Sequence, residues 1–541
     1  MSLPQINDCI SRPQMSTELT LRSGHAGLDA LPPRILGFLR HDSTDYNMFG
    51  RQLRGYRSPD APSIWLRDHS DMMRGFRYFE RDMKSVIEHF AETQTAQGWF
   101  FDYFTMTPEK VPCEKENWAK YVRVPVEADV EYRFVKAVYL VWQATGDDAW
   151  MKRMIPHIEK GLAYILSDPW RWDRKHRLVK RAYTIDTWDF DYTAGRHSWL
   201  NFQITDHTFW GVMHGDNSGY YEAFVLLSKL YAHLRNSRRA AHWRRFAESF
   251  RKRANALCFN GTFYTHHVPL VPVAIEGVDV RRQLSLSNPM DINRGMATHA
   301  MAVSILREYQ ERERSTRAFA PWFTIDPPFP AGIFGDEKIV EGMYCNGGIM
   351  PLIGGEIARA AFEHGFESYG VEQLLKYEQL TAGNESFLWY FPNGEHATLE
   401  TSTSPDASPT DGWGSSSMLY ALVEGLAGVT DTDALFRSVR LAPRWIAAGQ
   451  DHAEVQAGYE ISGASFAYTM DHHPGAGSID VELHGRAGVD FHLLLPPGKK
   501  ATAVRVNGRQ TKFTNVSVEQ SSYVDATMQV RKKATVQIQY A

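Results

Sequence analysis

Apolar residues recur at helical spacing over most of the chain, from about Met72 to Val429. In one stretch they fall on a single face of the expected helix, at Phe134, Val138, Val141 and Trp142. The same spacing predicts helical segments over residues 74–94, 131–147, 220–237, 297–313, 355–366 and 415–429. This region is therefore expected to be mostly helical.

The pattern changes after about Asp433, where short segments alternate between apolar and polar positions. Gly, Pro and Asn-Gly separate them, as is typical of β-hairpins. Strands are predicted over residues 453–461, 464–470, 478–485, 489–497, 501–508 and 534–540. The predicted fold class is mainly α, with a small antiparallel β-sandwich after a large helical domain. We place an N-terminal extension at 1–24, the helical domain at 25–432 and the β domain at 433–541.

The composition is that of a folded globular protein, with 43% apolar, 23% charged and 13% aromatic residues among 541. A net charge of −4 gives no electrostatic attraction to nucleic acid or anionic lipid, so neither is an expected partner. The cysteines are too far apart in sequence to suggest a zinc site or a disulfide framework. They are Cys9, Cys113, Cys258 and Cys345. No metal is expected.

The N-terminal residues lack the features of an export signal. Such a signal has a basic start and an apolar run of about 7–15 residues. A cytoplasmic location is therefore expected. No apolar stretch approaches the roughly 20 residues of a membrane span, so a membrane is not an expected partner. The sequence leaves the oligomeric state open.

Two long connections between helical segments, residues 168–199 and 385–414, are rich in aromatic residues, Gly and Pro. Loops this long inside a compact domain are usually functional.

A W-L-R-D motif with Trp65, Arg67 and Asp68 stands just before a predicted helix. An Arg-Asp pair suits a hydroxyl-rich ligand, because the carboxylate accepts and the guanidinium donates several hydrogen bonds. Capping of the helix by Asp68 is the alternative.

The first long connection carries Asp186, Trp188, Asp189 and Asp191. Carboxylates packed among aromatic rings are partly desolvated, which raises their pKa and keeps one of them protonated as a general acid near neutral pH. A calcium loop and a solvated turn are the alternatives, although the glycine and the terminal Glu of an EF-hand are missing.

The second long connection carries Glu400, between a short β-like run and a Gly-Trp-Gly helix entry at Trp413. A carboxylate that faces Asp189 across a pocket is able to deprotonate a water attacking the anomeric carbon from the opposite side. Glu385 and Glu395 are competing bases in the same loop. Placement on the surface is an alternative for all three.

Two further segments carry side chains that suit sugar hydroxyls. One holds His214, Asp216 and Asn217, and the other holds Tyr344 and Asn346 beside a Gly pair that lets the backbone approach a ligand. Both segments are also typical of turns and helix caps. The sequence motifs of nucleotide-binding loops, serine hydrolases and zinc proteases are absent.

Taken in order, the motifs resemble those of the six-hairpin (α/α)6-barrel glycosidases, which include glucoamylases, trehalases, processing α-glucosidases and α-L-rhamnosidases. W-L-R-D at 65–68 is similar to the glucoamylase W-x-R-D, whose Arg and Asp bind the sugar of the innermost subsite. T-W-D-F at 187–190 looks like the trehalase W-D-F, in which the Asp is the general acid. T-L-E at 398–400 resembles the late loop that holds the catalytic base. N-G-G at 346–348 is similar to a tract of neutral invertases, and the β domain resembles the C-terminal sandwich of rhamnosidases and disaccharide phosphorylases.

The resemblance implies an (α/α)6 barrel and an inverting, exo-acting hydrolase for a terminal, α-linked sugar of an oligosaccharide or glycoside. It implies Asp189 as the general acid and Glu400 as the general base, and the reaction requires no cofactor. The residues expected to bind substrate are Trp65, Arg67, Asp68, Trp188, His214, Asp216, Asn346 and Trp413. The sugar, its anomer and its linkage stay open.

Three other functions also stay open. A disaccharide phosphorylase shares the architecture and uses phosphate in place of the base. A polysaccharide lyase removes a proton next to a uronate carboxylate, and would draw on groups such as His214, Asn217 and Tyr220. A carbohydrate-binding protein would carry inert carboxylates.

Overall fold

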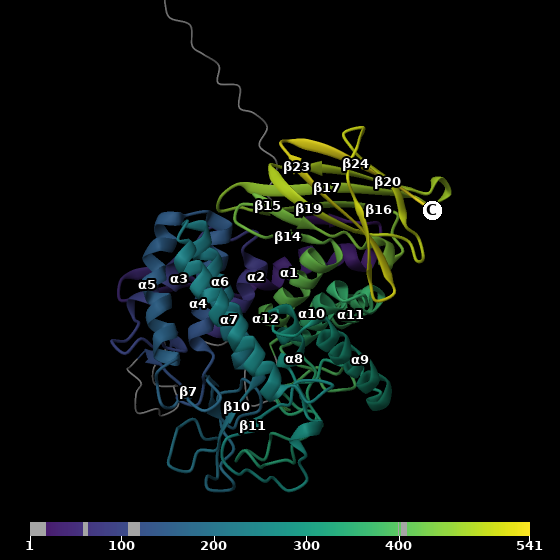
Figure 1. Ribbon diagram of the computed structural model, residues 1–541. Helices are drawn as coiled ribbons and strands as arrows, with labels where there is room; N and C mark the ends of the chain where they lie inside the picture. Colours follow the sequence, from purple (N-terminus) through teal and green to yellow (C-terminus); the bar gives the residue numbers. More distant parts are fainter. Residues whose placement is uncertain (1–17, 58–62, 106–119, 399, 402–407) are drawn as a thin grey trace, which may run out of the picture.

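The computed structural model of the chain describes residues 18–57, 63–105, 120–398, 400–401 and 408–541. A helical part comes first along the chain, and two large β-sheets follow it (Figure 1). The large sheets lie together at one side of the helical part, while the short strands β7, β10 and β11 lie at the far end. The predicted order of a helical domain followed by a β domain is confirmed.

Twelve α-helices lie in the described residues. They are α1 (Ala26–Asp42), α2 (Leu66–Phe76), α3 (Ser85–Glu92), α4 (Val130–Thr145), α5 (Asp148–Ile165), α6 (His214–His233), α7 (Ser237–Cys258), α8 (Ser287–Asn293), α9 (His299–Thr316), α10 (Pro351–Glu363), α11 (Glu367–Leu380) and α12 (Gly412–Tyr420). A π-helical segment, η4 (Ala421–Leu426), extends α12. Among the described residues, no helix is both long and apolar enough to cross a bilayer.

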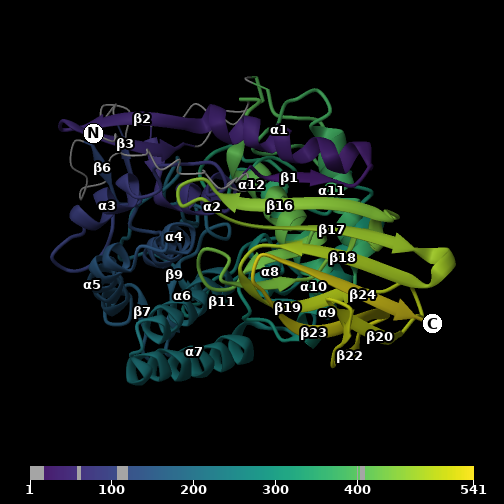
Figure 2. The same ribbon diagram turned by 90° about the horizontal axis from the view of Figure 1, so that it is seen from above.

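The even-numbered helices form a closed ring. Helix α2 contacts α4, and the contacts continue through α6, α8, α10 and α12 until α12 returns to α2. The odd-numbered helices pack against this ring, as α5 does on α4, α7 on α6 and α11 on α10. Seen from above, α5 and α7 lie toward the outside of α4 and α6 (Figure 2).

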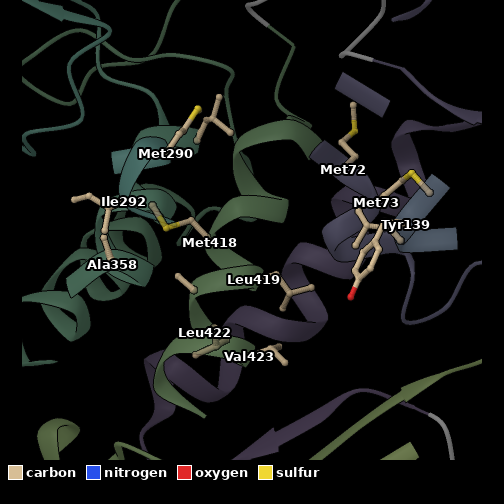
Figure 3. Packing of buried hydrophobic residues seen from close by; sticks show 14 of the residues in the cluster. Met72, Met73, Tyr139, Met290, Ile292, Ala358, Met418, Leu419, Leu422 and Val423 are labelled. Atoms are coloured by element: carbon tan, nitrogen blue, oxygen red, sulfur yellow. The ribbon is translucent and has the colours of Figure 1, made fainter. Parts of the chain in front are cut away.

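Part of the interior of the ring is apolar and closely packed. Figure 3 shows side chains of α2, α4, α8, α10, α12 and η4 near one another, namely Met72, Met73, Tyr139, Met290, Ile292, Ala358, Met418, Leu419, Leu422 and Val423. Glycine permits a close contact between two helices of the ring. A Cβ on Gly219 of α6 would lie 2.3 Å from the ring of Tyr132 on α4, so these two helices meet only because the side chain is absent.

We expect Gly219→Ala to lower the free energy of unfolding by about 1–3 kcal/mol, because the added methyl overlaps the ring of Tyr132. The matched control is Gly37→Ala on α1, where a Cβ meets nothing within 4 Å. That change should be neutral or stabilise by up to about 1 kcal/mol through helix propensity. Thermal melting of the two variants checks the prediction, and equal midpoints would contradict it.

The β domain consists of a seven-stranded sheet, ordered β1-β16-β17-β18-β24-β20-β21, and a five-stranded sheet, ordered β14-β15-β19-β23-β22. Neighbouring strands are antiparallel except β15 and β19, which are parallel. The strands are β1 (Thr20–Arg22), β14 (Val429–Asp431), β15 (Ser438–Leu441), β16 (His452–Tyr459), β17 (Ala464–His473), β18 (Ser478–His484), β19 (Ala487–Leu494), β20 (Ala501–Val506), β21 (Arg509–Gln510), β22 (Thr514–Val518), β23 (Ser521–Val530) and β24 (Lys533–Tyr540). All six predicted strand segments are present.

Short strands form small sheets within the helical part. They are β2 (Ser43–Met48), β3 (Arg51–Tyr56), β4 (Ser63–Trp65), β5 (Tyr103–Thr105), β6 (Tyr121–Val122), β7 (Trp172–Asp173), β8 (Leu178–Val179), β9 (Arg181–Ala182), β10 (Trp210–Val212), β11 (Val268–Pro269), β12 (Leu284–Ser285) and β13 (Ile325–Asp326). Strands β4 and β9 lead directly into residues discussed below.

The edges of the β domain differ from the sequence-based boundaries. Strand β1 belongs to the predicted N-terminal extension, yet it pairs with β16 in the large sheet. Strand β14 lies before Asp433 but already pairs with β15. The β domain is also tied to the helical part through Glu363 on α10, which accepts a hydrogen bond from Arg444 at 2.8 Å.

One helix prediction is wrong. Residues 74–94 share a helical apolar pattern, but α2 ends at Phe76 and α3 begins only at Ser85. Asp82 explains where the second helix starts, because its carboxylate accepts hydrogen bonds from the backbone N–H groups of Lys84 and Ser85, each at 3.0 Å. A side chain that satisfies free N–H groups at a helix start favours a new helix over a continuous one.

Candidate active site

Several charged side chains meet where the even-numbered helices begin. Arg67 and Asp216 stand in the first turns of α2 and α6, and Asp129 is the N-cap residue of α4. With Glu127, Arg181 and Asp189 they form what we call the charged cluster. The N-terminus of a helix carries partial positive charge and free N–H groups, which favours carboxylates at this end.

Arg67 is the centre of the charged cluster. Its Nε and Nη2 donate to the two carboxylate oxygens of Asp129 at 2.8 and 3.0 Å. Nη2 also lies 2.6 Å from Oε1 of Glu127. Burial opposes the charge, but Asp129 and Glu127 hold the pKa of Arg67 well above its usual range. The guanidinium is therefore fixed in position and permanently charged.

Asp189 follows strand β9 on the loop that leads to β10, and it is partly exposed. Burial raises its pKa to about 6, nearby Glu127 adds to the rise, and Arg67 and Arg181 oppose it. Arg181 also fixes the loop, because Nη2 donates to the carbonyl of Trp188 at 2.8 Å and Nη1 to Asp216 at 3.1 Å. A reachable carboxyl that keeps its proton near pH 6 has the property required of a general acid.

The raised pKa of Asp189 has a stability consequence. Folding raises the pKa of the Asp189 carboxyl, so the protonated carboxyl adds to the free energy of unfolding. This addition is complete below about pH 4 and is lost as the pH rises through about 6. Asp189→Asn mimics the neutral form, so the variant should exceed the wild type by about 1–3 kcal/mol at pH 8 and match it at pH 4. Melting of both proteins at the two pH values checks this, with the exposed Asp206→Asn as control. A difference that does not change with pH would contradict it.

Asp216, one of the residues expected to bind substrate, belongs to the charged cluster. It is buried and lies 3.1 Å from Nη1 of Arg181. Burial raises its pKa to about 6 against the opposing charge of Arg181. Asp68, next to Arg67, is also buried.

The predicted tryptophans lie around this region with their rings against other aromatic residues. Trp65, partly exposed, has its ring centre 3.9 Å from that of Tyr103. Trp188 is buried and meets Tyr344 edge to face at 5.3 Å. Trp413 is connected to the charged cluster through Asp71 and Arg133.

Trp413 stands in the first turn of α12 and donates through Nε1 to Oδ2 of Asp71 at 2.9 Å. Nη1 of Arg133 donates to the same carboxylate at 2.7 and 2.8 Å, and its Nε lies 3.4 Å from Asp129. Arg133 therefore links Trp413 and Asp71, on one side, to the charged cluster on the other.

His214 and Asn346 use their polar atoms on protein partners. His214 is fully buried, with Nδ1 2.5 Å from Oδ2 of Asp291 and Nε2 3.0 Å from Oγ of Ser285. Burial alone lowers the pKa of this imidazole, but Asp291 raises it above its usual range. Asn346 exchanges two hydrogen bonds with the backbone of Phe329, at 2.7 and 2.9 Å. Both side chains hold loops in place.

The three candidate bases lie on the surface. Glu385, Glu395 and Glu400 are all exposed. Glu400 occupies a turn beside residues 399 and 402–407, which lie outside the described residues. A hydrogen bond from Thr398 holds the pKa of Glu400 below its ordinary value, so this side chain is ionised at neutral pH, as a general base must be. The assignment of Glu400 as base stays a prediction.

Sequence reasoning missed Glu127, Asp129, Arg133 and Arg181. Glu127 and Asp129 stand just before the most regular helical pattern of the chain, so a helix-start analysis of that segment was the available signal. Among the described residues, no group of three or more His, Cys, Asp or Glu side chains is placed to hold a metal ion.

No family model matches the chain, and no curated protein matches its sequence. Solved structures do match. An α-L-rhamnosidase from Dictyoglumus thermophilum aligns over 96% of this chain and 50% of its own, with a TM-score of 0.58 and 10% identity. A Streptomyces avermitilis α-L-rhamnosidase complexed with L-rhamnose aligns over 96% and 42%, with a TM-score of 0.57 and 11% identity. This chain spans about half the length of these rhamnosidase structures.

Another similar structure is aligned over almost its whole length. A GH63 mannosylglycerate hydrolase from Thermus thermophilus, in complex with glucose, aligns over 73% of this chain and 99% of its own, with a TM-score of 0.52 and 14% identity. The chain shares the fold of these glycoside hydrolases. The resemblance predicted from the motifs is thereby confirmed for the fold.

Proposed function

We propose that this protein is an inverting, exo-acting glycoside hydrolase, whose ring of even-numbered helices is the inner wall of an (α/α)6 barrel. The proposal rests on the surroundings of the Asp189 carboxyl. This carboxyl is partly exposed and has a pKa raised to about 6, and it lies beside Arg67 and Arg181 where the ring helices begin. This combination is what protonation of a leaving oxygen requires.

In the proposed reaction, Asp189 gives its proton to the glycosidic oxygen as the bond from that oxygen to the anomeric carbon breaks. Water attacks the anomeric carbon from the opposite face and loses its proton to Glu400. One displacement of this kind inverts the anomeric configuration and requires the two carboxyl groups to stand about 6.5–9.5 Å apart. Neither proton transfer uses a cofactor.

The substrate is proposed to be a terminal, α-linked sugar of an oligosaccharide or a smaller glycoside. Arg67 and Asp68 hydrogen-bond its hydroxyls, and Trp65 provides an aromatic face. The similar structures suggest which compounds to try first, because their titles name an α-L-rhamnosidase and a mannosylglycerate hydrolase. A cytoplasmic location stays part of the proposal.

A release assay tests the function. The purified protein is incubated with α-L-rhamnosides, mannosylglycerate and other natural and aryl α- and β-glycosides, with and without phosphate, and the product anomer is followed by proton NMR. Release with inversion and without phosphate dependence supports the proposal. Dependence on phosphate would identify a phosphorylase instead, and an unsaturated uronate product would identify a lyase.

The pKa of Asp189 predicts the pH dependence of the reaction. A general acid works only while protonated, so kcat/KM should fall about tenfold per pH unit above pH 6, the pKa of Asp189. The descending limb should disappear in Asp189→Asn, whose amide does not titrate. Initial rates between pH 4 and 9 check this, and a descending limb that persists unchanged in the variant would contradict it.

A further inference from the structure

A small polar cavity lies on the axis of the helix ring. All six even-numbered helices contribute to it, and we call it the axial cavity. Its lining consists of Asp71, Arg74, Tyr132, Arg133, Lys136, Glu222, Asn293, Arg294, Glu356 and Tyr420. The centres of water-sized spheres have ≈ 30 Å³ open to them, so the axial cavity has room for small occupants the size of water.

Positive charge exceeds negative charge in this lining. Arg74, Arg133, Lys136 and Arg294 face three carboxylates, Asp71, Glu222 and Glu356. Each carboxylate already has a cation: Arg133 binds Asp71, Lys136 binds Glu222 and Arg74 binds Glu356.

Arg294 is the cation that remains. Among the described residues, it forms no ion pair within 4 Å, and its Nη1 donates to the carbonyl of Gly215 and to Oγ of Ser218, both at 2.9 Å. These acceptors are neutral, and the four cations of the lining exceed its three carboxylates by one positive charge. Burial lowers the pKa of Arg294, but Tyr132 and Glu222 raise it above the usual range, so the side chain stays charged in the axial cavity.

Arg74 supplies a second, independent observation. The side chain is more than nine-tenths buried. Its Nη1 binds Glu356 and its Nε donates to the carbonyl of Asp71, but Nη2 has no hydrogen-bond partner among the described residues. A buried donor without an acceptor is rare in folded proteins. The axial cavity thus has one donor without a partner and an excess of one positive charge, and an anion satisfies both.

We propose that the axial cavity is a binding site for one small monovalent anion of the chloride type. The lining carries one more positive charge than negative charge, which one monovalent anion balances, and a halide takes up about the space of one water. The anion accepts from Nη2 of Arg74 and neutralises the charge of Arg294. Its position also matters for the candidate active site, because Asp71 borders the axial cavity and binds Trp413 and Arg133.

The direct test is a crystal of the wild-type protein grown or soaked in sodium bromide, with data collected at the bromine absorption edge. We expect an anomalous peak inside the axial cavity, next to Arg74 and Arg294. No peak there at saturating bromide, with water in its place, would overturn the proposal. The test does not depend on enzymatic activity, so it separates this inference from the proposed function.

Two variants and a control extend the test to solution. Arg294→Met removes the unpaired charge, and Arg74→Lys keeps the charge but removes the nitrogen without a partner. Arg251→Met is the control, because Arg251 is also partly buried but lies outside the axial cavity and binds Glu248 at 2.8 Å. If a variant does not fold, the wild-type crystal still decides.

The readout is melting in sodium chloride against sodium gluconate at equal ionic strength. In the wild type and in Arg251→Met, chloride should raise the midpoint saturably by a few degrees, since a ligand that binds only the folded state stabilises it. Arg294→Met and Arg74→Lys should need at least about tenfold more chloride, which corresponds to a loss of about 1.4 kcal/mol in binding. An equal, non-saturating rise in all four proteins is general screening and would overturn the proposal.

Discussion

Asp189→Asn should lower kcat for release of a natural glycoside by about 10²–10⁴-fold while the fold survives. The amide has nearly the volume of the carboxyl group but has no acidic proton to give to the leaving oxygen. The loss should shrink for an aryl glycoside with an acidic phenol, because such a leaving group departs without protonation. Steady-state rates on the two kinds of substrate, with melting curves as a check on folding, measure the effect.

Asp191→Asn is the matched control for Asp189→Asn. Asp191 stands two residues further along the same loop, and burial raises its pKa to about 7. Its carboxylate, however, accepts a hydrogen bond from Asn201 at 2.6 Å, and it lies outside the charged cluster with Arg67. A loss in Asp191→Asn that depends on the leaving group, together with near wild-type activity in Asp189→Asn, would reassign the acid.

The charged cluster shows what the sequence could and could not predict about the site. The short motifs W-L-R-D and T-W-D-F identified Arg67 and Asp189 as candidates from the sequence alone. The partners of Arg67 were not predictable in this way. Glu127 and Asp129 lie about sixty residues further along the chain and reach Arg67 only because α2 and α4 are neighbours in the ring. Periodicity predicts that a helix exists, but it does not predict which helix lies beside it.

The same limit applies to polar side chains that turn out to be buried. His214 and Asn346 have chemistry that suits a sugar, and their sequence context does not distinguish a ligand from a neighbouring loop. The structure shows that they satisfy Asp291, Ser285 and the backbone of Phe329. Such contacts join residues far apart in the chain, so they depend on tertiary structure alone.

The β domain was predictable where one face of a strand is apolar. Strand β18 alternates along its length, with Ile479, Val481 and Leu483 buried. Strand β23 was missed, because Ser521–Val530 begins with two serines and carries polar residues at several of its buried or half-buried positions. Its place in the sheet follows from pairing with β19 over eight residues. No local sequence pattern predicts this pairing.

Glu400→Gln should lower kcat by a similar factor, about 10²–10⁴, but with a different dependence on substrate. Water must lose its proton whatever group departs, so the loss should be equal for natural and aryl glycosides. Azide attacks without deprotonation, and it should restore turnover in Glu400→Gln with a glycosyl azide as product. Steady-state kinetics with and without azide measure both effects.

The two competing bases provide matched controls, since Glu385 and Glu395 are exposed in the same connection as Glu400. Glu385→Gln and Glu395→Gln should retain most of the wild-type activity and gain nothing from azide. If one of them instead shows the equal loss and the azide rescue, the base lies there. An acid variant whose loss depends on the leaving group and a base variant whose loss does not would together establish two carboxyl groups with separate roles, which is the chemical content of the inverting mechanism.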